Sequence, residues 1–294
     1  MQMLFSALRQ CGLMIKKLQK AFSFMKRSQK RKKNFLFVLI IIVIGANQIL
    51  FAQNTEQQDI KKLFKGHKGS FVLYDKQNKK YFRYNEARCI ERFLPASTFK
   101  IANSLIALET GVAADENFVI KWDGKKRWNA DWNHDHNLAS AIKYSVVPYY
   151  QELARRIGNE QYKKWLDAIS YGNQVIGENI DSFWLDNSLK ISADEQIIFM
   201  KRFYDYRLPF SKGNVDIVKK ILPEEKYKHS ILKYKTGTGT KEDGVFLGWL
   251  VGYVEKEKNV YLFAFNIESK TFDEVRKLRD TTLRRILKSL KVLQ

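Results

Sequence analysis

Residues 93–105 read Phe93-Leu94-Pro95-Ala96-Ser97-Thr98-Phe99-Lys100-Ile101-Ala102-Asn103-Ser104-Leu105. Pro95 fixes the backbone just before a predicted helix, in which apolar residues recur at helical spacing over 99–108. Ser97 and Lys100 would lie on one face of that helix, with the amine within reach of the hydroxyl. A lysine whose pKa is lowered by desolvation can take the proton of a serine and activate it as a nucleophile. The stretch therefore predicts a nucleophilic serine at a helix start, where free N–H groups can stabilise an oxyanion.

The spacing alone is a weak signal, because Ser-x-x-Lys also occurs at Ser23, Ser140 and Ser230. Those three serines lack the combination of a proline-led turn, a helix start and an apolar helix behind it. A second interpretation of Ser97 stays open, in which it is an ordinary helix N-cap hydroxyl and Lys100 is a solvated charge. The choice between the two depends on the motifs that accompany this stretch.

The composition indicates one compact, basic domain. With 294 residues, of which 45% are hydrophobic and 14% aromatic, the chain can bury a proper core, and it shows no repeat. Its formal net charge is +21, and residues 1–52 supply +10 of this through seven Lys and three Arg with no acid. The remaining basic balance suits a solvated exterior or an anionic substrate. We predict no nucleic-acid partner and no particular oligomer.

Residues 1–52 predict an export leader. The basic run 26–33 leads into the apolar stretch 35–46, and a small residue follows at a plausible cleavage point. The apolar run is shorter than the roughly 20 residues that a membrane-spanning helix needs. We therefore predict a signal peptide, with Met25 as a candidate start, and an exported domain over 53–294 that is periplasmic or secreted. In the alternative, the leader stays as an uncleaved anchor and is the only contact with a membrane.

Neither a disulfide nor a metal is predicted for the exported domain. Cys11 and Cys89 are the two cysteines, and cleavage of the leader would leave Cys89 alone. His134 and His136 lie in a polar, tryptophan-rich loop over 121–136, and no spaced Cys or Glu partners surround them. The domain must therefore be held together by its core.

The hydrophobic period changes twice along the chain. We expect strands at 69–75 and 80–85 in a hairpin, helices at 138–144, 149–157, 160–169, 193–206 and 214–222, strands at 230–235, 245–255 and 259–267, and a last basic helix at 273–293. Strands at both ends with helices between them are typical of an α+β fold rather than of alternating units. We expect one antiparallel sheet flanked by N- and C-terminal helices beside a mainly helical region.

A second cluster, Lys235-Thr236-Gly237-Thr238-Gly239, lies at the end of a predicted strand. A cation, a hydroxyl and two glycines would let a substrate carboxylate approach the backbone closely. The same residues also fit a charged strand edge that enters a turn. Between the two clusters stand Ser145-x-Val147 on a turn between helices, Tyr171-Gly172-Asn173, and Trp184. This order of short motifs favours the catalytic interpretation of Ser97.

Over about residues 60–294, these motifs resemble those of the class D β-lactamases, the oxacillinases, within the serine penicillin-recognising enzymes. Class A enzymes and penicillin-binding proteins carry Ser-Asp-Asn where this chain has Ser145-x-Val147, and this difference points to class D. Phe183-Trp184-Leu185 and the run 147–158 also look like that family. The resemblance implies a β-lactamase/transpeptidase-like fold and a serine hydrolase that opens the β-lactam ring through an acyl-serine.

The resemblance also implies a role for each catalytic residue. Ser97 would be the nucleophile, and Lys100 would react with carbon dioxide to give a carbamate that serves as the general base, with no metal or other cofactor. The indole N–H of Trp184 would hold the carbamate. Ser145 would relay a proton toward the departing ring nitrogen, with Lys235 beside it.

On the substrate side, the resemblance implies that Thr236 and Arg279 bind the substrate carboxylate. The backbone N–H groups of Ser97 and Thr238 would hold the oxyanion. The assignment of Arg279 stays open because three more arginines lie close to it in the sequence, namely Arg276, Arg284 and Arg285. The predicted substrate-binding set is Val147, Thr236, Gly237, Thr238 and Arg279.

Three other functions remain alternatives. A membrane-tethered β-lactam sensor has a similar domain that is acylated without turnover, and a retained leader would favour it. A cell-wall transpeptidase or carboxypeptidase is the next alternative. The last is a non-catalytic binding domain whose motifs are fortuitous, and such a domain would form no acyl-serine with a penicillin.

Overall fold

The computed structural model describes residues 57–294, so the predicted leader lies outside the described residues. The compact unit that carries everything below is Ile60–Gln294. Among the helices of the described residues, none is both long and apolar enough to span a membrane.

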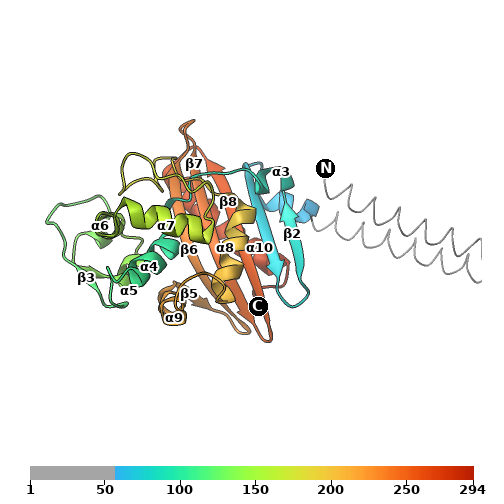
Figure 1. Ribbon diagram of the computed structural model, residues 1–294. Helices are drawn as coiled ribbons and strands as arrows, with labels where there is room; N and C mark the ends of the chain where they lie inside the picture. Colours follow the sequence, from blue (N-terminus) through green and yellow to red (C-terminus); the bar gives the residue numbers. More distant parts are fainter. Residues whose placement is uncertain (1–56) are drawn as a thin grey trace, which may run out of the picture. The chain divides into compact units, whose positions relative to one another are not determined.

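A six-stranded antiparallel sheet in the order β2-β1-β8-β7-β6-β5 forms the centre of this unit (Figure 1). The strands are β1 (Gly69–Asp75), β2 (Lys80–Tyr84), β5 (Glu224–Lys226), β6 (Ser230–Thr240), β7 (Phe246–Lys256) and β8 (Asn259–Ser269). The predicted N-terminal hairpin joins the C-terminal strands by pairing β1 with β8, with Phe71 opposite Phe265. The expected antiparallel sheet built from both ends of the chain is therefore confirmed, and a separate two-stranded sheet, which was not expected, pairs Val119–Ile120 with His136–Asn137.

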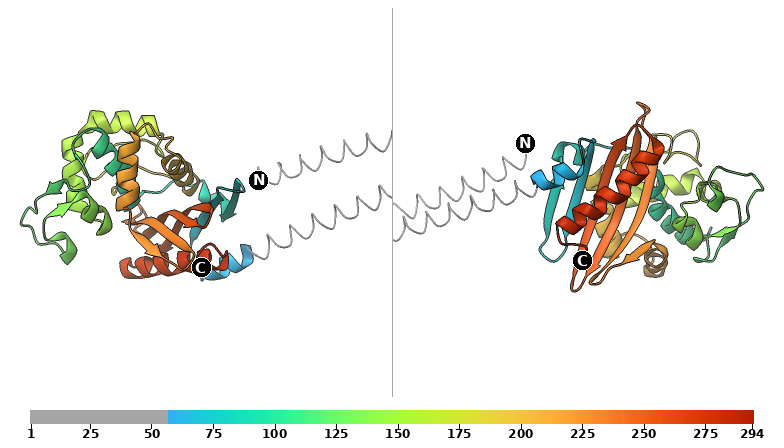
Figure 2. Two further views of the ribbon diagram at one scale, coloured as in Figure 1. Left: turned by 90° about the horizontal axis from the view of Figure 1, so that it is seen from below. Right: turned by 180° about the vertical axis from the view of Figure 1, so that it is seen from behind.

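Alternation along β7 explains why both faces of the sheet are covered. Trp249 and Val251 point to one hydrophobic core, and Leu250 and Val254 point to the other. Helix α8 (Ala193–Tyr204) packs on the first face and α10 (Phe272–Ser289) on the second. Figure 2 shows α10 lying across the back of the sheet. These two helices and the sheet make three layers, as expected for an α+β domain.

The remaining helices form the mainly helical region beside the sheet. They are α4 (Lys100–Glu109), α5 (Leu138–Lys143), α6 (Val147–Ile157), α7 (Asn159–Ile169) and α9 (Lys212–Ile221). Helix α4 is buried from Lys100 to Leu108 and packs against α6 and α9. The short elements are α3 (Glu86–Cys89), β3 (Val119–Ile120), β4 (His136–Asn137), and the 3₁₀ turns η1 (Ala96–Phe99) and η2 (Ala130–Trp132). Residues 57–63, at the start of the described part of the chain, are also helical.

Local signals set most of these boundaries. The predicted capping box at the start of α8 is present, with Ser192 and Glu195 bonding each other's backbone N–H. Pro148 lies in the first turn of α6, where its missing N–H costs no hydrogen bond.

Two details differ from the prediction. Ser97 lies in the 3₁₀ turn η1, and the α-helix begins only at Lys100. The cluster that begins at Lys235 lies inside β6, which continues to Thr240, rather than at the end of a strand. Pairing with β7 along this whole length explains the second difference, because two glycines that weaken a strand signal are held by their ladder partners.

Candidate active site

The turn that carries Ser97 is an unusual piece of backbone. Ala96 has a φ of 48°, in the left-handed region that residues other than glycine rarely adopt. Its N–H donates to the carbonyl of Trp184 at 3.0 Å, and this contact holds the turn. Such backbone strain persists only where surrounding structure supports it, and it is commonly found at functional sites.

The predicted pair of Ser97 and Lys100 is brought together by this turn. Lys100 Nζ lies 2.8 Å from Ser97 Oγ, and the Lys100 side chain is 0% exposed. Burial lowers the pKa of Lys100 to about 7, because the charged amine loses its water and no carboxylate among the described residues replaces it. At neutral pH a large fraction of Lys100 is thus an uncharged amine that can accept a proton. The alternative of an N-cap serine with a solvated lysine is contradicted.

Ser145 and Lys235 form a second pair of hydroxyl and amine. Ser145 lies on the turn between α5 and α6 with a φ of 56°, and Lys235 Nζ donates to its Oγ at 3.0 Å. Lys235 is buried, and its pKa is lowered well below the usual value by burial, with smaller effects of the charges on Lys100 and Arg279. The positive charge on the amine of one pair therefore lowers the pKa of the amine of the other.

The two glycines of β6 allow a close approach within the protein. A Cβ on Gly237 would lie 2.9 Å from the carbonyl oxygen of Pro95, and one on Gly239 would lie 2.6 Å from Leu94 Cδ1. Both glycines therefore approach the residues of the turn that carries Ser97, and the predicted approach of a substrate carboxylate stays a prediction. This approach places the edge of β6, with Thr238, directly beside the serine turn.

Arg279 reaches the site from α10. Its Nη1 donates to Thr238 Oγ1 at 2.8 Å and to the Gly237 carbonyl at 3.2 Å, and its Nε and Nη2 contact Asp280 at 3.0 and 3.2 Å. The structure thus joins Arg279 to Thr238, and the binding of a substrate carboxylate by Thr236 and Arg279 stays a prediction. Thr236 Oγ1 instead accepts from Lys235 Nζ at 3.4 Å.

Trp184 is carried by a loop that the Tyr171-Gly172-Asn173 motif closes. Asn173 Oδ1 accepts the N–H of Lys190 at 2.8 Å, and its Nδ2 donates to the Ser188 carbonyl at 2.8 Å. The Trp184 ring is fully buried and stacks on Phe99, with centroids 5.8 Å apart. Its indole Nε1 is one of three buried side-chain polar atoms within residues 57–294 that have no hydrogen-bond partner. A buried donor without an acceptor lowers the stability of the fold by about 1–3 kcal/mol, so binding of an anionic acceptor at this N–H would be favourable.

One cavity of about 340 Å³ is lined by six of the ten predicted site residues, whereas Lys100, Trp184, Lys235 and Gly237 do not line it. It is lined by Ser97, Ser145, Val147, Thr236, Thr238 and Arg279. The sequence analysis named Arg276 only as an alternative to Arg279, and it missed other residues of the wall, among them Trp128, Trp132, Tyr144 and Phe272. The tryptophan-rich composition of the 121–136 loop was a usable signal for the first two, since exposed aromatic residues in a loop often serve binding.

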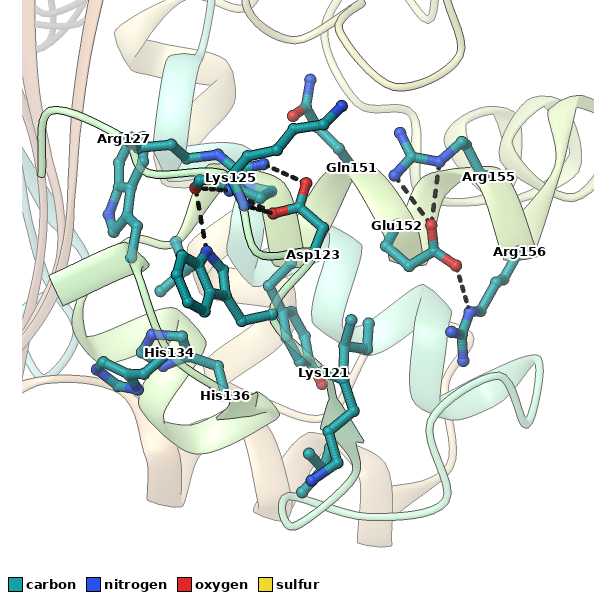
Figure 3. Close-up of a pocket in the computed structure, with 17 residues that line it drawn as sticks. Lys121, Asp123, Lys125, Arg127, His134, His136, Gln151, Glu152, Arg155 and Arg156 are labelled. Carbon is teal, nitrogen blue, oxygen red and sulfur yellow. Dashed lines mark hydrogen bonds and ion pairs between the residues drawn. The ribbon is translucent and has the colours of Figure 1, made fainter. Parts of the chain in front are cut away.

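A larger cavity, of about 540 Å³, lies between the 121–136 loop and α6 (Figure 3). Its charged residues largely pair among themselves, as in the contacts of Asp123 with Arg127 and of Glu152 with Arg155 and Arg156. His136 lines it but is bound to Ser140 Oγ and the Asp131 carbonyl. No cluster of three or more His, Cys, Asp or Glu that could hold a metal occurs among the described residues. We assign the chemistry to the smaller cavity because Ser97 and Ser145, the hydroxyl members of the two pairs, line it.

Comparisons with known proteins point in one direction. Residues 41–288 match the family described as the penicillin binding protein transpeptidase domain. The chain is 46% identical over 232 residues to β-lactamase OXA-48 of Klebsiella pneumoniae, covering 78% of this chain and 87% of that protein. The crystal structure of the class D β-lactamase YbXI from Nostoc superposes with a TM-score of 0.76 at 42% identity, covering 81% of this chain and 99% of that one. Regulatory protein BlaR1 of Bacillus licheniformis is 35% identical over 235 residues, covering 79% of this chain but 39% of that protein.

Proposed function

The chain belongs to the class D β-lactamases, and from this membership we propose that it hydrolyses β-lactam antibiotics with Ser97 as its nucleophile. One observation carries the assignment of the nucleophile. Ser97 Oγ lies 2.8 Å from a fully buried amine whose pKa is lowered to about 7. This arrangement supplies a base for the serine proton at neutral pH.

In the acylation step, Ser97 Oγ attacks the carbonyl carbon of the β-lactam and its proton passes to the base at Lys100. The carbonyl oxygen becomes an oxyanion that the backbone N–H groups of Ser97 and Thr238 hold. When the ring C–N bond breaks, the nitrogen takes a proton through Ser145, whose Oγ is bonded to Lys235 Nζ. The product is an acyl-serine in which the ring nitrogen has become an amine.

The site fits a carbamate on Lys100. Carbon dioxide reacts with an uncharged amine, and the lowered pKa of Lys100 supplies that form. The unpartnered indole N–H of Trp184, beside the serine turn, offers a donor to a new anionic oxygen. When bound, the carbamate supplies a basic oxygen for the proton of Ser97 and for that of the water that hydrolyses the acyl-serine. The amine of Lys100 is fully buried and lies 5.2 Å from the centroid of the Tyr150 ring, so bulk water is kept from it.

The substrate carboxylate is bound, in this proposal, by the hydroxyl groups of Thr236 and Thr238 and by Arg279. Arg279 Nη1 donates to Thr238 Oγ1, and both residues line the cavity. Val147 supplies an apolar wall of the same cavity, and Gly237 shapes the site through its close approach to the serine turn.

We further propose that residues 1–52 export the domain 53–294 to the periplasm or the medium. The basic run followed by an apolar stretch supports this proposal. It can be tested by the N-terminal sequence of the protein recovered from a bacterial culture.

A second function has one observation in its favour, namely the likeness to the regulatory protein BlaR1. In that case the chain would be a sensor that is acylated without turnover. A penicillin-binding transpeptidase or carboxypeptidase would show the same slow release of its acyl group.

One experiment separates these functions. The purified protein is given a chromogenic cephalosporin with and without bicarbonate, and its intact mass is recorded. Many turnovers that rise with bicarbonate, and no acyl adduct in Ser97→Ala, are expected of the hydrolase. One equivalent of stable acyl-protein would favour the sensor or the penicillin-binding protein. Absence of any adduct at Ser97 would overturn the proposed nucleophile.

A further inference from the structure

Two cations line the wall of the catalytic cavity without a carboxylate partner. Arg276 extends from α10 and Lys143 from the end of α5, and both are exposed side chains on the same cavity as Ser97. Among residues 57–294, no carboxylate forms an ion pair or hydrogen bond with either of them. The proposed reaction uses neither residue.

Arg279, by contrast, is largely compensated. Its Nε and Nη2 contact the Asp280 carboxylate, and its Nη1 is bonded to Thr238 and to the Gly237 carbonyl. Arg276 lies three residues earlier on the same helix, one turn away. The uncompensated positive charge on this wall therefore belongs to Arg276 rather than to Arg279.

The Arg276 guanidinium is also held in place. It lies over the Phe272 ring at 5.4 Å from the centroid, an i,i+4 contact on α10. Phe272 is in turn fixed by edge contacts with Trp128 at 5.6 Å and with Phe246 at 6.0 Å. An arginine that stacks on a fixed ring loses little side-chain freedom when it binds an anion, which makes binding more favourable.

One carboxylate on the same wall opposes these cations. Asp131 lines the cavity from the 121–136 loop. Lys143, Arg276 and Arg279 still outnumber Asp131 and the paired Asp280. The wall therefore carries a net positive charge. A substrate with one negative charge, bound through its ring carboxylate, neutralises only part of that charge.

We propose that Arg276, assisted by Lys143, forms a second anion subsite of the catalytic cavity, for a carboxylate or sulfonate that the substrate carries in addition to its ring carboxylate. This inference rests on the proposed function. It makes doubly anionic β-lactams a favoured substrate class of this enzyme.

The test uses two penicillins that differ by one carboxylate, benzylpenicillin and α-carboxybenzylpenicillin. We expect Arg276→Gln to lower kcat/KM for the doubly charged substrate by roughly 3- to 10-fold relative to benzylpenicillin, mostly through KM. Arg276→Lys should restore part of the loss, because it keeps the charge. Raising the salt concentration should reduce the preference of the wild-type enzyme and leave that of Arg276→Gln nearly unchanged.

Arg285→Gln is the matched control, because Arg285 is an exposed arginine of the same helix that does not line the cavity. It removes the same charge and should leave the ratio of the two substrates unchanged. An equal loss for both substrates in Arg276→Gln, no loss at all, or the same selective loss in Arg285→Gln would each overturn the subsite. If the wild-type protein neither hydrolyses nor is acylated by benzylpenicillin, the proposed function itself fails, and the subsite falls with it.

Discussion

Lys100→Met keeps the length of a buried side chain and removes its amine, and we expect the variant to be inactive but harder to unfold. The pKa of Lys100 falls from an ordinary 10.5 to about 7 on folding. At 1.36 kcal/mol per pKa unit, burial of this amine costs the folded state about 5 kcal/mol at acidic pH. Methionine avoids that cost but loses the contact with Ser97 Oγ and some packing. We expect a net gain of about 2 kcal/mol in the free energy of unfolding at pH 7.

The gain should depend on pH with a definite sign. Between pH 7 and 10.5 the unfolded chain binds a proton at Lys100 that the folded chain does not, so wild-type stability rises with pH in this window. The advantage of Lys100→Met is therefore largest at or below pH 7. It should shrink by about 2 kcal/mol between pH 7 and pH 9.

The assay is urea unfolding followed by tryptophan fluorescence in bicarbonate-free buffers at pH 7 and pH 9. Lys163→Met, at an exposed lysine of α7, is the control and should show no pH-dependent change relative to wild type. Turnover of a cephalosporin by Lys100→Met should fall by roughly 10²- to 10⁴-fold, the usual contribution of a general base. A Lys100→Met protein that is less stable than wild type at both pH values, or a stability difference that is the same at both, would refute the reasoning.

Three further predictions concern the same site. With a pKa of about 7, the uncharged fraction of Lys100 is about 0.1 at pH 6 and about 0.9 at pH 8. Acylation of Ser97 without bicarbonate, measured by rapid-quench mass spectrometry, should therefore be roughly ninefold slower at pH 6 than at pH 8. An acylation rate that does not change with pH would contradict Lys100 as the base. Trp184→Phe keeps a buried aromatic ring but removes the unpartnered N–H. The bicarbonate concentration that gives half-maximal turnover should therefore rise by roughly tenfold. An unchanged bicarbonate dependence would exclude the role given to this indole. Gly237→Ala places a Cβ 2.9 Å from a backbone oxygen of the serine turn, so it should destabilise the fold by about 1–3 kcal/mol in urea unfolding and slow the acylation of Ser97. In the control variant Gly213→Ala, the new Cβ meets nothing within 4 Å. Equal stability and equal acylation rates of the two variants would show that the close approach is unimportant.

Much of the fold was predictable because its signals are local. The hairpin of β1 and β2, the capping box before α8 and the amphipathic α10 follow from residues adjacent in the chain. The extent of β6 did not follow, because its second half is stabilised by pairing with β7 and not by its own glycine-rich sequence. The 3₁₀ form of the turn at Ser97 was missed for a similar reason, since the Ala96 N–H is held by a residue of a distant loop.

The candidate site shows the same division. Ser97 and Lys100 were found from their spacing together with the proline-led turn and the apolar helix around them. Ser145 and Lys235 were found from short motifs whose roles the family resemblance supplied. Phe272 was not identified as part of the wall and Arg276 was named only as an alternative to Arg279, because nothing in the sequence near them indicates that the start of α10 faces the same cavity as the 121–136 loop. The pairing of Arg279 with Thr238 likewise depends on how α10 lies against β6.

The sequence by itself therefore determined which chemical groups are available, their order along the chain, and the helices and strands that carry them. The tertiary structure decided what those groups can do. The proposed role of Lys100 as a base depends on packing, which removes the water around its amine and offers no carboxylate in return. Trp184 becomes a candidate partner of an anion only because burial leaves its N–H without an acceptor. Desolvation and close approach are properties of three-dimensional packing, which the spacing of residues along a chain does not contain.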